Sequence, residues 1–537
     1  MITFDYLTLK AFFEENKDFF CGARLQKIQQ PTRRDFVLSI RGFETRKLYI
    51  NIDPQVYHVC FLSEESYEKR NITIPQKPPM FCMLLRKYLE GFRISGVNVP
   101  PYERIFEIFF ESYNELNEKI KLCLAIELMG KYSNVILYNC DTKIIIGCAH
   151  NVGSEKSRER ELSGTMPYVY PHKQDKSDIL RYFGDVHYDC LNDDFLGFSK
   201  SLQEQLKRNN VPLEKIKNYI ELKEPLSPAI NDKEYSLYSE LLPNAEGCLN
   251  VNDMIDKYFS NQQEIIIKRA LRSKLRNIIY PLYKKEKLLS EKLNGQLNKK
   301  SNATKYKKYA DLILANLFQA SDYSRNIAVN DWEDDSKELI IPLDEKLTLK
   351  ENAKKYYEMY SKSKSAVERL QELYIKSISQ SEYLEGILYS IDNADRLSDL
   401  FEILSECEEQ GFVKKREEQK KSKDINIMTV NINGYTVYVG KNNKQNDLIV
   451  SKISSGEDLW FHSQNCPGSH VLLKLENGAE PDDDTILKCC ELAKKHSSAS
   501  DDTKAGVIYT KRKFLKKPPK SNLGYVTYKN EQEIIVE

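Results

Sequence analysis

Two short stretches near the C-terminal end of the chain gather residue types that suit RNA binding. Trp460 and His462 lie in the first and Ser469 and His470 in the second, in a chain of 537 residues with only two tryptophans and seven histidines. An aromatic face can stack on an unpaired base, and histidine or serine can hydrogen-bond to phosphate or sugar. We predict that these four side chains face RNA. The alternative is a strand–turn–strand in which Trp460 fills a core and the histidines satisfy backbone groups.

A basic segment follows these two stretches. Between residues 504 and 530 there are eight basic residues and no acidic ones, with four aromatic residues among them. Cations with aromatic rings between them indicate a nucleic-acid surface. The alternative is a lysine-rich sheet edge that keeps strands from aggregating.

Composition limits the class of protein. A net charge of +1 with 30% charged residues predicts long solvated helices with segregated charges, rather than a uniformly basic protein. The chain shows no signal peptide and no apolar run long enough to span a membrane, so we expect a cytoplasmic protein. Twelve scattered cysteines without a CxxC pair predict a reducing compartment and no metal site.

The elements that must position these residues divide into four predicted domains. Residues 1–176 read as a mixed α/β domain. Residues 177–252 read as short helices, in which Gly197 could form a helix-hairpin-helix turn that receives a phosphate, or a plain loop. The predicted elements of the first domain are helices at 4–20 and 80–89 and strands at 24–28, 36–40, 47–50, 104–110 and 133–138.

Residues 253–423 are predicted to form a long antiparallel coiled-coil hairpin. A long helix is predicted from about 253, with apolar residues close to heptad spacing between Leu271 and Leu289. Pro281 should kink this helix or mark its repair by a neighbouring segment. A small tip insert near 305–345 contains Trp332, and a second helical run extends from 348 to about 409. An ordinary helical bundle is the alternative, but the many exposed charges favour the hairpin.

Residues 424–537 are predicted to be β-rich. The fold class is therefore α+β and multidomain. The predicted elements of this last domain are a helix at 484–496 and strands at 425–432, 435–439, 448–450, 471–475, 507–509 and 534–536.

Several of these stretches resemble the NFACT family, in its bacterial RqcH group. Residues 438–443, 445–447, 458–462 and 467–471 resemble the signature of the C-terminal NFACT-R domain, and residues 127–134 resemble that of the NFACT-N domain. The resemblance covers the whole chain in order. It implies an N-terminal domain similar to formamidopyrimidine-type DNA glycosylases, but Ile2 and Thr3 replace the proline and glutamate that those enzymes use.

The resemblance also implies a function. Members of the family bind a large ribosomal subunit (its rRNA) that still carries peptidyl-tRNA after a stall, and they recruit alanyl-tRNA. They support C-terminal tailing of the nascent chain without mRNA, which marks it for degradation. The ribosome's peptidyl-transferase centre makes the bond, so the resemblance implies no catalytic residue and no cofactor, and a monomer on the ribosome. The sequence agrees, because it has no P-loop and no nucleophile elbow.

The residues expected to contact tRNA lie in the N-terminal domain. In the family an Asp-Arg pair contacts tRNA, and here Glu103 and Arg104 stand in its place, with one methylene more in the acid. Arg104 could grip a phosphate or a base edge with two hydrogen bonds, or it could form a surface ion pair. The other residues that the resemblance assigns, or that we expect as backbone contacts, are Glu127, Leu128, Met129, Lys131, Arg158 and Arg160.

Two other functions compete with this one. Relatives are often labelled fibronectin-binding proteins, which suggests a surface adhesin, but the chain shows no signal peptide or anchor. A glycosylase-like nuclease is the third hypothesis, and Ile2 argues against it.

Overall fold

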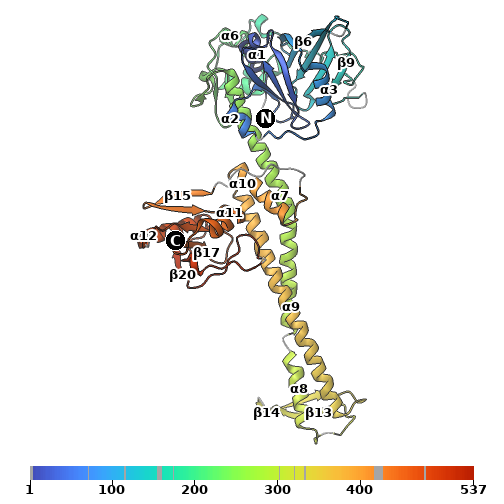
Figure 1. The fold of residues 1–537 in the computed structure, drawn as a ribbon, viewed down its shortest axis with the longest axis vertical. Coiled ribbons are helices and arrows are strands. Elements are labelled where there is room, and N and C mark those ends of the chain that lie inside the picture. The colour runs from blue at the N-terminus through green and yellow to red at the C-terminus, as the bar shows by residue number, and fades with distance from the viewer. Residues whose placement is uncertain are drawn as a thin grey trace. The chain divides into compact units, whose positions relative to one another are not determined.

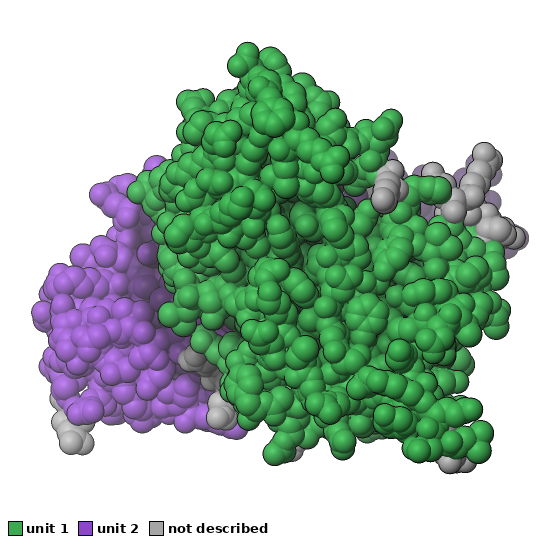
Figure 2. Space-filling model, turned by 90° about the horizontal axis from the view of Figure 1, so that it is seen from above, with its two compact units in different colours: residues 1–266 green, residues 267–537 purple. Residues whose placement is uncertain are grey.

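The computed structural model describes residues 4–70, 72–113, 116–153, 160–172, 174–300, 303–319, 321–331, 334–415, 427–476, 479–519 and 521–537. Ile2, Thr3, Arg158, Trp332 and most of the predicted linker at 414–423 lie outside them. The chain divides into two compact units, residues 1–266 and 267–537, which Figure 2 colours separately. Among the described helices, none is long and apolar enough to cross a membrane.

A nine-stranded antiparallel sheet forms the core of the first unit (Figure 1). The strand order is β4-β3-β2-β1-β5-β6-β7-β8-β9. The bounds are β1 Arg24–Gln29, β2 Asp35–Arg41, β3 Thr45–Asn51, β4 His58–Phe61, β5 Arg93–Asn98, β6 Ile105–Tyr113, β7 Lys119–Glu127, β8 Asn134–Asn139 and β9 Ile145–Cys148. Three helices accompany it: α1 Tyr6–Phe20, α2 Glu64–Lys69 and α3 Met80–Leu89.

Local chemistry explains where the first helix begins. Asp5 is its N-cap and accepts a hydrogen bond from the Thr8 amide, 2.9 Å away. The apolar face of α1 then packs into the core with Phe4, Phe12 and Phe20, all fully buried. The predicted helices at 4–20 and 80–89 are confirmed. So are the five predicted strands, whereas β4, β5, β7 and β9 were missed.

The rest of the first unit is built from short elements. Helices α4 (Leu191–Asp194), α5 (Lys200–Arg208) and α6 (Leu213–Glu221) precede a small sheet of β10 (Ala229–Ile230), β11 (Tyr235–Ser236) and β12 (Glu246–Gly247). Gly197 has φ of +86° between α4 and α5, a conformation that glycine adopts without strain. The helix-hairpin-helix label for this region stays a prediction, because α4 is a single turn.

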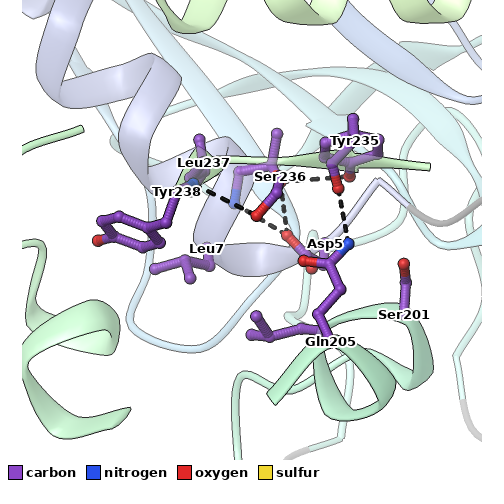
Figure 3. Close-up of a pocket in the computed structure, with 10 residues that line it drawn as sticks. Asp5, Leu7, Ser201, Gln205, Tyr235, Ser236, Leu237 and Tyr238 are labelled. Carbon is purple, nitrogen blue, oxygen red and sulfur yellow. Dashed lines mark hydrogen bonds between the residues drawn. The ribbon is translucent and has the colours of Figure 1, made fainter. Parts of the chain in front are cut away.

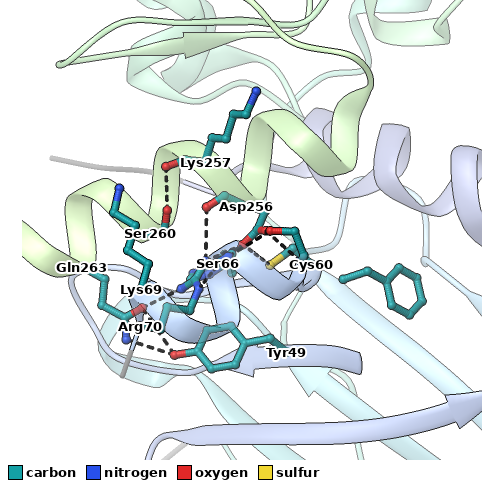
Figure 4. Close-up of polar contacts among 12 residues, drawn as sticks. Tyr49, Cys60, Ser66, Lys69, Arg70, Asp256, Lys257, Ser260 and Gln263 are labelled. Carbon is teal, nitrogen blue, oxygen red and sulfur yellow. Dashed lines mark hydrogen bonds and ion pairs between the residues drawn. The ribbon is translucent and has the colours of Figure 1, made fainter. Parts of the chain in front are cut away.

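The first turns of α7 (Val251–Lys300) are tied to this unit by a buried polar cluster, which Figure 4 shows. Asp256 pairs with Arg70 at 3.0 Å, and their side chains are only 5% and 2% exposed. Asp256 also accepts hydrogen bonds from the Ser66 hydroxyl and the Ser63 amide. Gln263 accepts from Arg70 at 2.6 Å, about two turns further along the helix. Gln263 also donates to the Tyr49 hydroxyl at 3.0 Å, so these bonds fix the helix to strand β3 and to helix α2 with its flanking residues.

In the second unit α7 runs antiparallel to α9 (Leu349–Asp392). Arg272 donates to the Ile391 carbonyl and Ser377 donates to the Glu286 carbonyl, so one sequence rises as the other falls. Their buried apolar residues, such as Leu275 and Ile387, form a common core. Pro281 lies inside α7, which continues through it. The elements between the two helices are α8 (Ala303–Ala315), β13 (Asn326–Asp331) and β14 (Asp334–Pro342).

The prediction of one helical run from 348 to about 409 was wrong. The chain leaves α9 at Asn393 and begins α10 (Leu397–Glu409) after a short break. Asp399 explains the restart, because its carboxylate accepts from the Arg396 amide in a capping box. Helix α10 then ends at Glu409, close to the predicted end of the run, and Gly411 follows with φ of +76°.

A six-stranded antiparallel sheet forms the C-terminal domain, in the order β15-β16-β18-β17-β19-β20. Helix α12 (Asp483–Lys495) packs against it, close to the predicted helix. The strand predicted at 448–450 was wrong. Asn442 caps α11 (Asn443–Leu448), which continues as a π-helix at Ile449–Ile453. The strand bounds are β15 Met428–Ile432, β16 Tyr435–Val439, β17 Leu459–Ser463, β18 Val471–Leu473, β19 Ala505–Lys511 and β20 Gln532–Val536.

Candidate nucleic-acid interfaces

Two of the predicted tRNA-binding stretches meet at one end of the large sheet. Arg104 precedes β6 and Glu127 ends β7, and the register pairs Ile105 with Glu127. The Leu128 amide also donates to the Arg104 carbonyl at 2.9 Å. Residues more than 20 positions apart in the sequence are therefore neighbours, because antiparallel pairing joins the start of one strand to the end of the next.

Arg104 remains available at this end of the sheet. Its side chain is partly exposed, and one guanidinium nitrogen donates to the Tyr57 hydroxyl at 3.2 Å. Tyr57 is itself buried, and its pKa is raised by that burial although the neighbouring cation acts in the opposite direction. A single hydrogen bond orients the guanidinium and leaves other N–H donors for a phosphate or a base edge. Glu103 is also partly exposed beside it.

Glu127 does not face solvent, which corrects the expectation of a direct tRNA contact by its carboxylate. The side chain is 0% exposed and pairs with Arg160 at 2.5 Å. The Tyr168 hydroxyl donates to its other oxygen at 3.0 Å. Burial raises the pKa of Glu127, while Arg160 and Tyr168 act to lower it. The pair ties the segment after residue 160 to strand β7, so Glu127 and Arg160 have a structural role here.

The turn after Glu127 presents a cation and an aromatic ring. The Met129 amide donates to the Ser133 hydroxyl at 2.9 Å, and Gly130 takes φ of +63° to close the turn. Lys131 and Tyr132 then point outward, with Tyr132 69% exposed and the Lys131 amine 4.8 Å from its ring. Sequence reasoning missed Tyr132, although it lies inside the quoted 127–134 motif. Leu128 is fully buried and Met129 partly buried, so they shape this turn from within.

In the C-terminal domain the structure favours the core for three of the four predicted RNA-facing residues. Trp460 is 1% exposed, Ser469 is 5% and His470 is 3%, and only His462 is partly exposed. Trp460 lies on β17, an inner strand paired to β18 and β19, and its side chain packs into an apolar cluster that includes Ile449 and Leu515. Trp460 is therefore no open stacking platform, and that part of the prediction is corrected.

The two histidines pack around this tryptophan. The His462 ring stacks on Trp460 with centroids 5.7 Å apart, and the His470 ring meets it edge-on at 5.1 Å. Burial lowers the pKa of His462, and burial together with the proximity of His462 lowers the pKa of His470 well below its usual value. Both imidazoles are therefore neutral at physiological pH and can accept hydrogen bonds.

A glycine and an asparagine hold the loop that carries His470. Asn446 accepts a hydrogen bond from the His470 amide at 3.0 Å. A Cβ at Gly440 would stand 2.1 Å from the same Asn446 oxygen, so only glycine fits there. Close packing therefore explains why Gly440 and Asn446 occur together in the stretch that resembles the NFACT-R signature.

Several basic side chains of the segment at 504–530 are engaged in contacts within the protein, which the sequence does not indicate. Lys511 and Lys513 both pair with Glu457, and Lys517 pairs with Asp447. Arg512 donates to the Val450 carbonyl and the Ser454 hydroxyl, which makes it a structural residue. Acids from other parts of the sequence therefore neutralise much of the charge, which no local count of residues could reveal.

One cavity in the first unit is too small to be a ligand site. It has a volume of about 20 Å³ and is lined by Asp5, Gln205 and Tyr235 among others (Figure 3). That volume holds about one water molecule.

The chain matches two family models. The one described as NFACT N-terminal and middle domains matches residues 5–425, and the one described as NFACT protein RNA binding domain matches residues 426–530. Two similar proteins are both named Rqc2 homolog RqcH. The Bacillus subtilis protein is 29% identical and the Streptococcus pneumoniae (serotype 2) protein 26% identical, each over 100% of this chain and 98% of the relative.

A solved structure also resembles part of the chain. It is the N-terminal part of the fibronectin/fibrinogen-binding protein from Streptococcus suis. The identity is 24% and the TM-score 0.43, over 48% of this chain and 100% of that one.

Proposed function

Because the chain belongs to the NFACT family, we propose that it is a ribosome quality-control factor. It binds a large ribosomal subunit that carries peptidyl-tRNA, recruits alanyl-tRNA and supports C-terminal tailing of the stalled chain in the cytoplasm. The ribosome makes the peptide bond. The protein contributes orientation and effective concentration, which accelerate a reaction without a catalytic residue.

The observation that carries this proposal is agreement over the full length with relatives named for this role. It is supported by the end of the large sheet, where Arg104, Lys131 and Tyr132 belong to adjacent elements. Two cations and an exposed ring suit a backbone phosphate and an unpaired base. The adhesin alternative is supported by the name of the Streptococcus suis neighbour alone.

The proposed division of labour assigns tRNA to the first unit and RNA contacts on the ribosome to the C-terminal domain. Residues 1–176, 177–252, 253–423 and 424–537 are the proposed domain limits. Among the described residues, the proposed direct tRNA contacts are Arg104, Lys131 and Tyr132, with Glu103 beside them, and Arg158 stays a prediction. Glu127 and Arg160 form a buried ion pair that stabilises this surface without contacting tRNA.

The decisive experiment replaces the exposed guanidinium. Arg104→Ala should weaken tRNA binding by about tenfold or more, because one lost specific contact costs about 1–3 kcal/mol. Binding is measured by crosslinking and sequencing of RNA recovered with the protein from cells with stalled ribosomes. Co-sedimentation with large subunits should persist.

Arg181→Ala is the matched control, since Arg181 is an arginine of the same unit whose side chain is 89% exposed. It should leave tRNA recovery unchanged. Loss of both tRNA and large subunits from a folded Arg104→Ala protein would contradict the assignment. A wild-type protein that recovers neither RNA would contradict the function itself.

A further inference from the structure

A cavity of about 400 Å³ lies in the second unit, between helix α9 and the C-terminal sheet domain. Its volume is in the range of small-molecule sites and is too small for a folded segment. Aromatic and polar side chains share its lining. Residues that line it include Gly386, Tyr389, Trp460, His470, Tyr525 and Tyr528.

Two buried ring nitrogens, on residues that line this cavity, have no hydrogen-bond partner within the described residues. They are Nε1 of Trp460 and Nδ1 of His470, on side chains that are 1% and 3% exposed. Leaving a buried polar atom without a partner destabilises the folded protein, so native proteins have few such atoms and each of them needs an explanation. One is an obligate donor, whereas the neutral imidazole nitrogen can accept or donate according to its tautomer.

Aromatic planes stand beside these two nitrogens. The Tyr528 ring lies 6.0 Å from the Trp460 ring at an interplanar angle of 35°. Tyr525 and Tyr528 remain 45% and 37% exposed, so their rings can still cover a ligand. Lys441 also lines the cavity, with its amine 3.4 Å from an Asp395 carboxylate that is 80% exposed.

We propose that this cavity takes a single unstacked nucleobase of single-stranded RNA. The base inserts between the tyrosines, its edge exchanges hydrogen bonds with Trp460 Nε1 and His470 Nδ1, and Lys441 lies near its phosphate. Every nucleobase has hydrogen-bonding groups on its edge and a π-face. The ring nitrogens and the aromatic planes of the lining match these two features. The inference rests on the proposed function, because it names the RNA feature that the C-terminal domain recognises.

This assignment gives Trp460 a different part from surface stacking. Its ring is packed in an apolar cluster on the sheet, and its N–H has no partner among the described residues. A pocket that reads the edge of an extruded base requires that kind of fixed donor, because a mobile one would lose entropy on binding.

Glycine 386 provides a variant that fills the cavity without touching these groups. A Cβ built there meets only the Asn443 side-chain oxygen, at 3.7 Å, which is ordinary contact. Gly386→Ala is therefore tolerated and should favour helix α9. In Gly386→Leu the longer side chain extends from the same position and occupies the space of a base.

The test photocrosslinks the full-length protein to a short single-stranded oligouridylate that carries 4-thiouridine, followed by peptide mapping. In the wild type and in Gly386→Ala, adducts should map to residues 460–470 or 522–528. Gly386→Leu should reduce them about tenfold, since a stacked base contributes about 1–3 kcal/mol. Trp460→Phe, which keeps a ring and removes the N–H, should reduce them as well, and the melting temperature checks that each variant is folded.

The outcomes separate the two proposals. Oligonucleotide adducts elsewhere on the domain that Gly386→Leu leaves unchanged, with tRNA and large-subunit binding intact, would overturn the cavity and keep the function. Adducts in the cavity from an unstructured peptide probe, and none from the oligonucleotide, would overturn it too. Failure of the wild type to bind any RNA would overturn both.

Discussion

At the scale of single residues, burial separates side chains that the sequence presents as equals. Arg104 and Arg160 are both arginines expected to contact tRNA. Arg104 keeps free donors at the surface, while Arg160 neutralises a carboxylate that is 0% exposed. A buried charge must be paired, because leaving it alone in the protein interior costs several kcal/mol. Arg160 therefore already pairs with Glu127 in the protein without tRNA.

That commitment predicts the effect of Glu127→Ala. The change leaves Arg160 and the Tyr168 hydroxyl without their partner, so we expect a loss of about 3 kcal/mol in the free energy of unfolding. This is the lower end for a broken buried pair, since Arg160 is 15% exposed. Urea denaturation of the first unit measures it.

Glu111→Ala is the control for that experiment, because Glu111 lies on the adjacent strand β6 and pairs with Lys119 near the surface. It should shift the urea midpoint little. If Glu127→Ala is as stable as the wild type but loses tRNA, the carboxylate has a direct role and the structural assignment is wrong.

At the scale of elements, a polar cluster adds directional bonds to the apolar packing that attaches helix α7 to the first unit. Asp256 receives hydrogen bonds from Ser63 and Ser66 and the charge of Arg70, all from the segment that follows β4 (Figure 4). Apolar packing is non-directional, whereas these bonds have fixed geometry. They therefore specify the register in which the helix joins the sheet.

Asp256→Asn should release this attachment. The substitution leaves the Arg70 guanidinium, 2% exposed, without its counter-charge, and we expect a loss of about 3–5 kcal/mol. Hydrogen exchange should increase in residues 251–266 in particular. Lys257→Ala, on the same helix but with a side chain 45% exposed, should leave the exchange of that segment unchanged. Equal protection of residues 251–266 in Asp256→Asn and wild type would show that apolar packing alone holds the helix.

At the scale of the whole molecule, buried histidines make the stability sensitive to mild acid. His58 is 0% exposed with its ring stacked 4.5 Å from Phe259, and burial lowers its pKa well below 6.5. Below pH 6.5 the unfolded chain binds a proton that the folded chain excludes, so stability falls as the pH falls. Glu127 and Glu406 have raised pKa values and act in the opposite sense.

The prediction is therefore made as a difference between two proteins. Between pH 7 and 5.5 the wild type should lose more unfolding free energy than His58→Asn, by up to about 1.4 kcal/mol per pH unit. The Asn amide nitrogen takes the place of Nδ1 and can keep the hydrogen bond that the ring makes to the Val56 carbonyl. Parallel pH profiles from urea denaturation would contradict it.

Charge balance at the same scale predicts the salt dependence of RNA binding. A net charge of +1 means that no uniform field attracts RNA, so affinity must come from local cations. We expect affinity for tRNA to fall steeply with salt, and the slope of Arg104→Ala to be smaller by about one. Titrations at several salt concentrations measure both. A flat dependence would indicate contacts without phosphates.

The sequence by itself determined the family and many of the regular elements, because such elements depend on local patterns. Helix α3 and strand β16 have the predicted limits, since apolar period and turn residues act within a few positions. The apolar triplet at 448–450 misled this reasoning, because a run of three fits a strand or a helix and the Asn442 cap decided for the helix.

Only the tertiary structure decided which functional residues are accessible. Glu127 pairs with Arg160, 33 positions away, instead of making the predicted contact to tRNA. Lys517 pairs with Asp447, which is 70 positions away. Trp460 is buried on an inner strand of a sheet, and the cavity beside it is lined in part by residues of α9. Ion pairing, burial and cavities depend on segments that are distant in sequence, so no local sequence pattern indicates them.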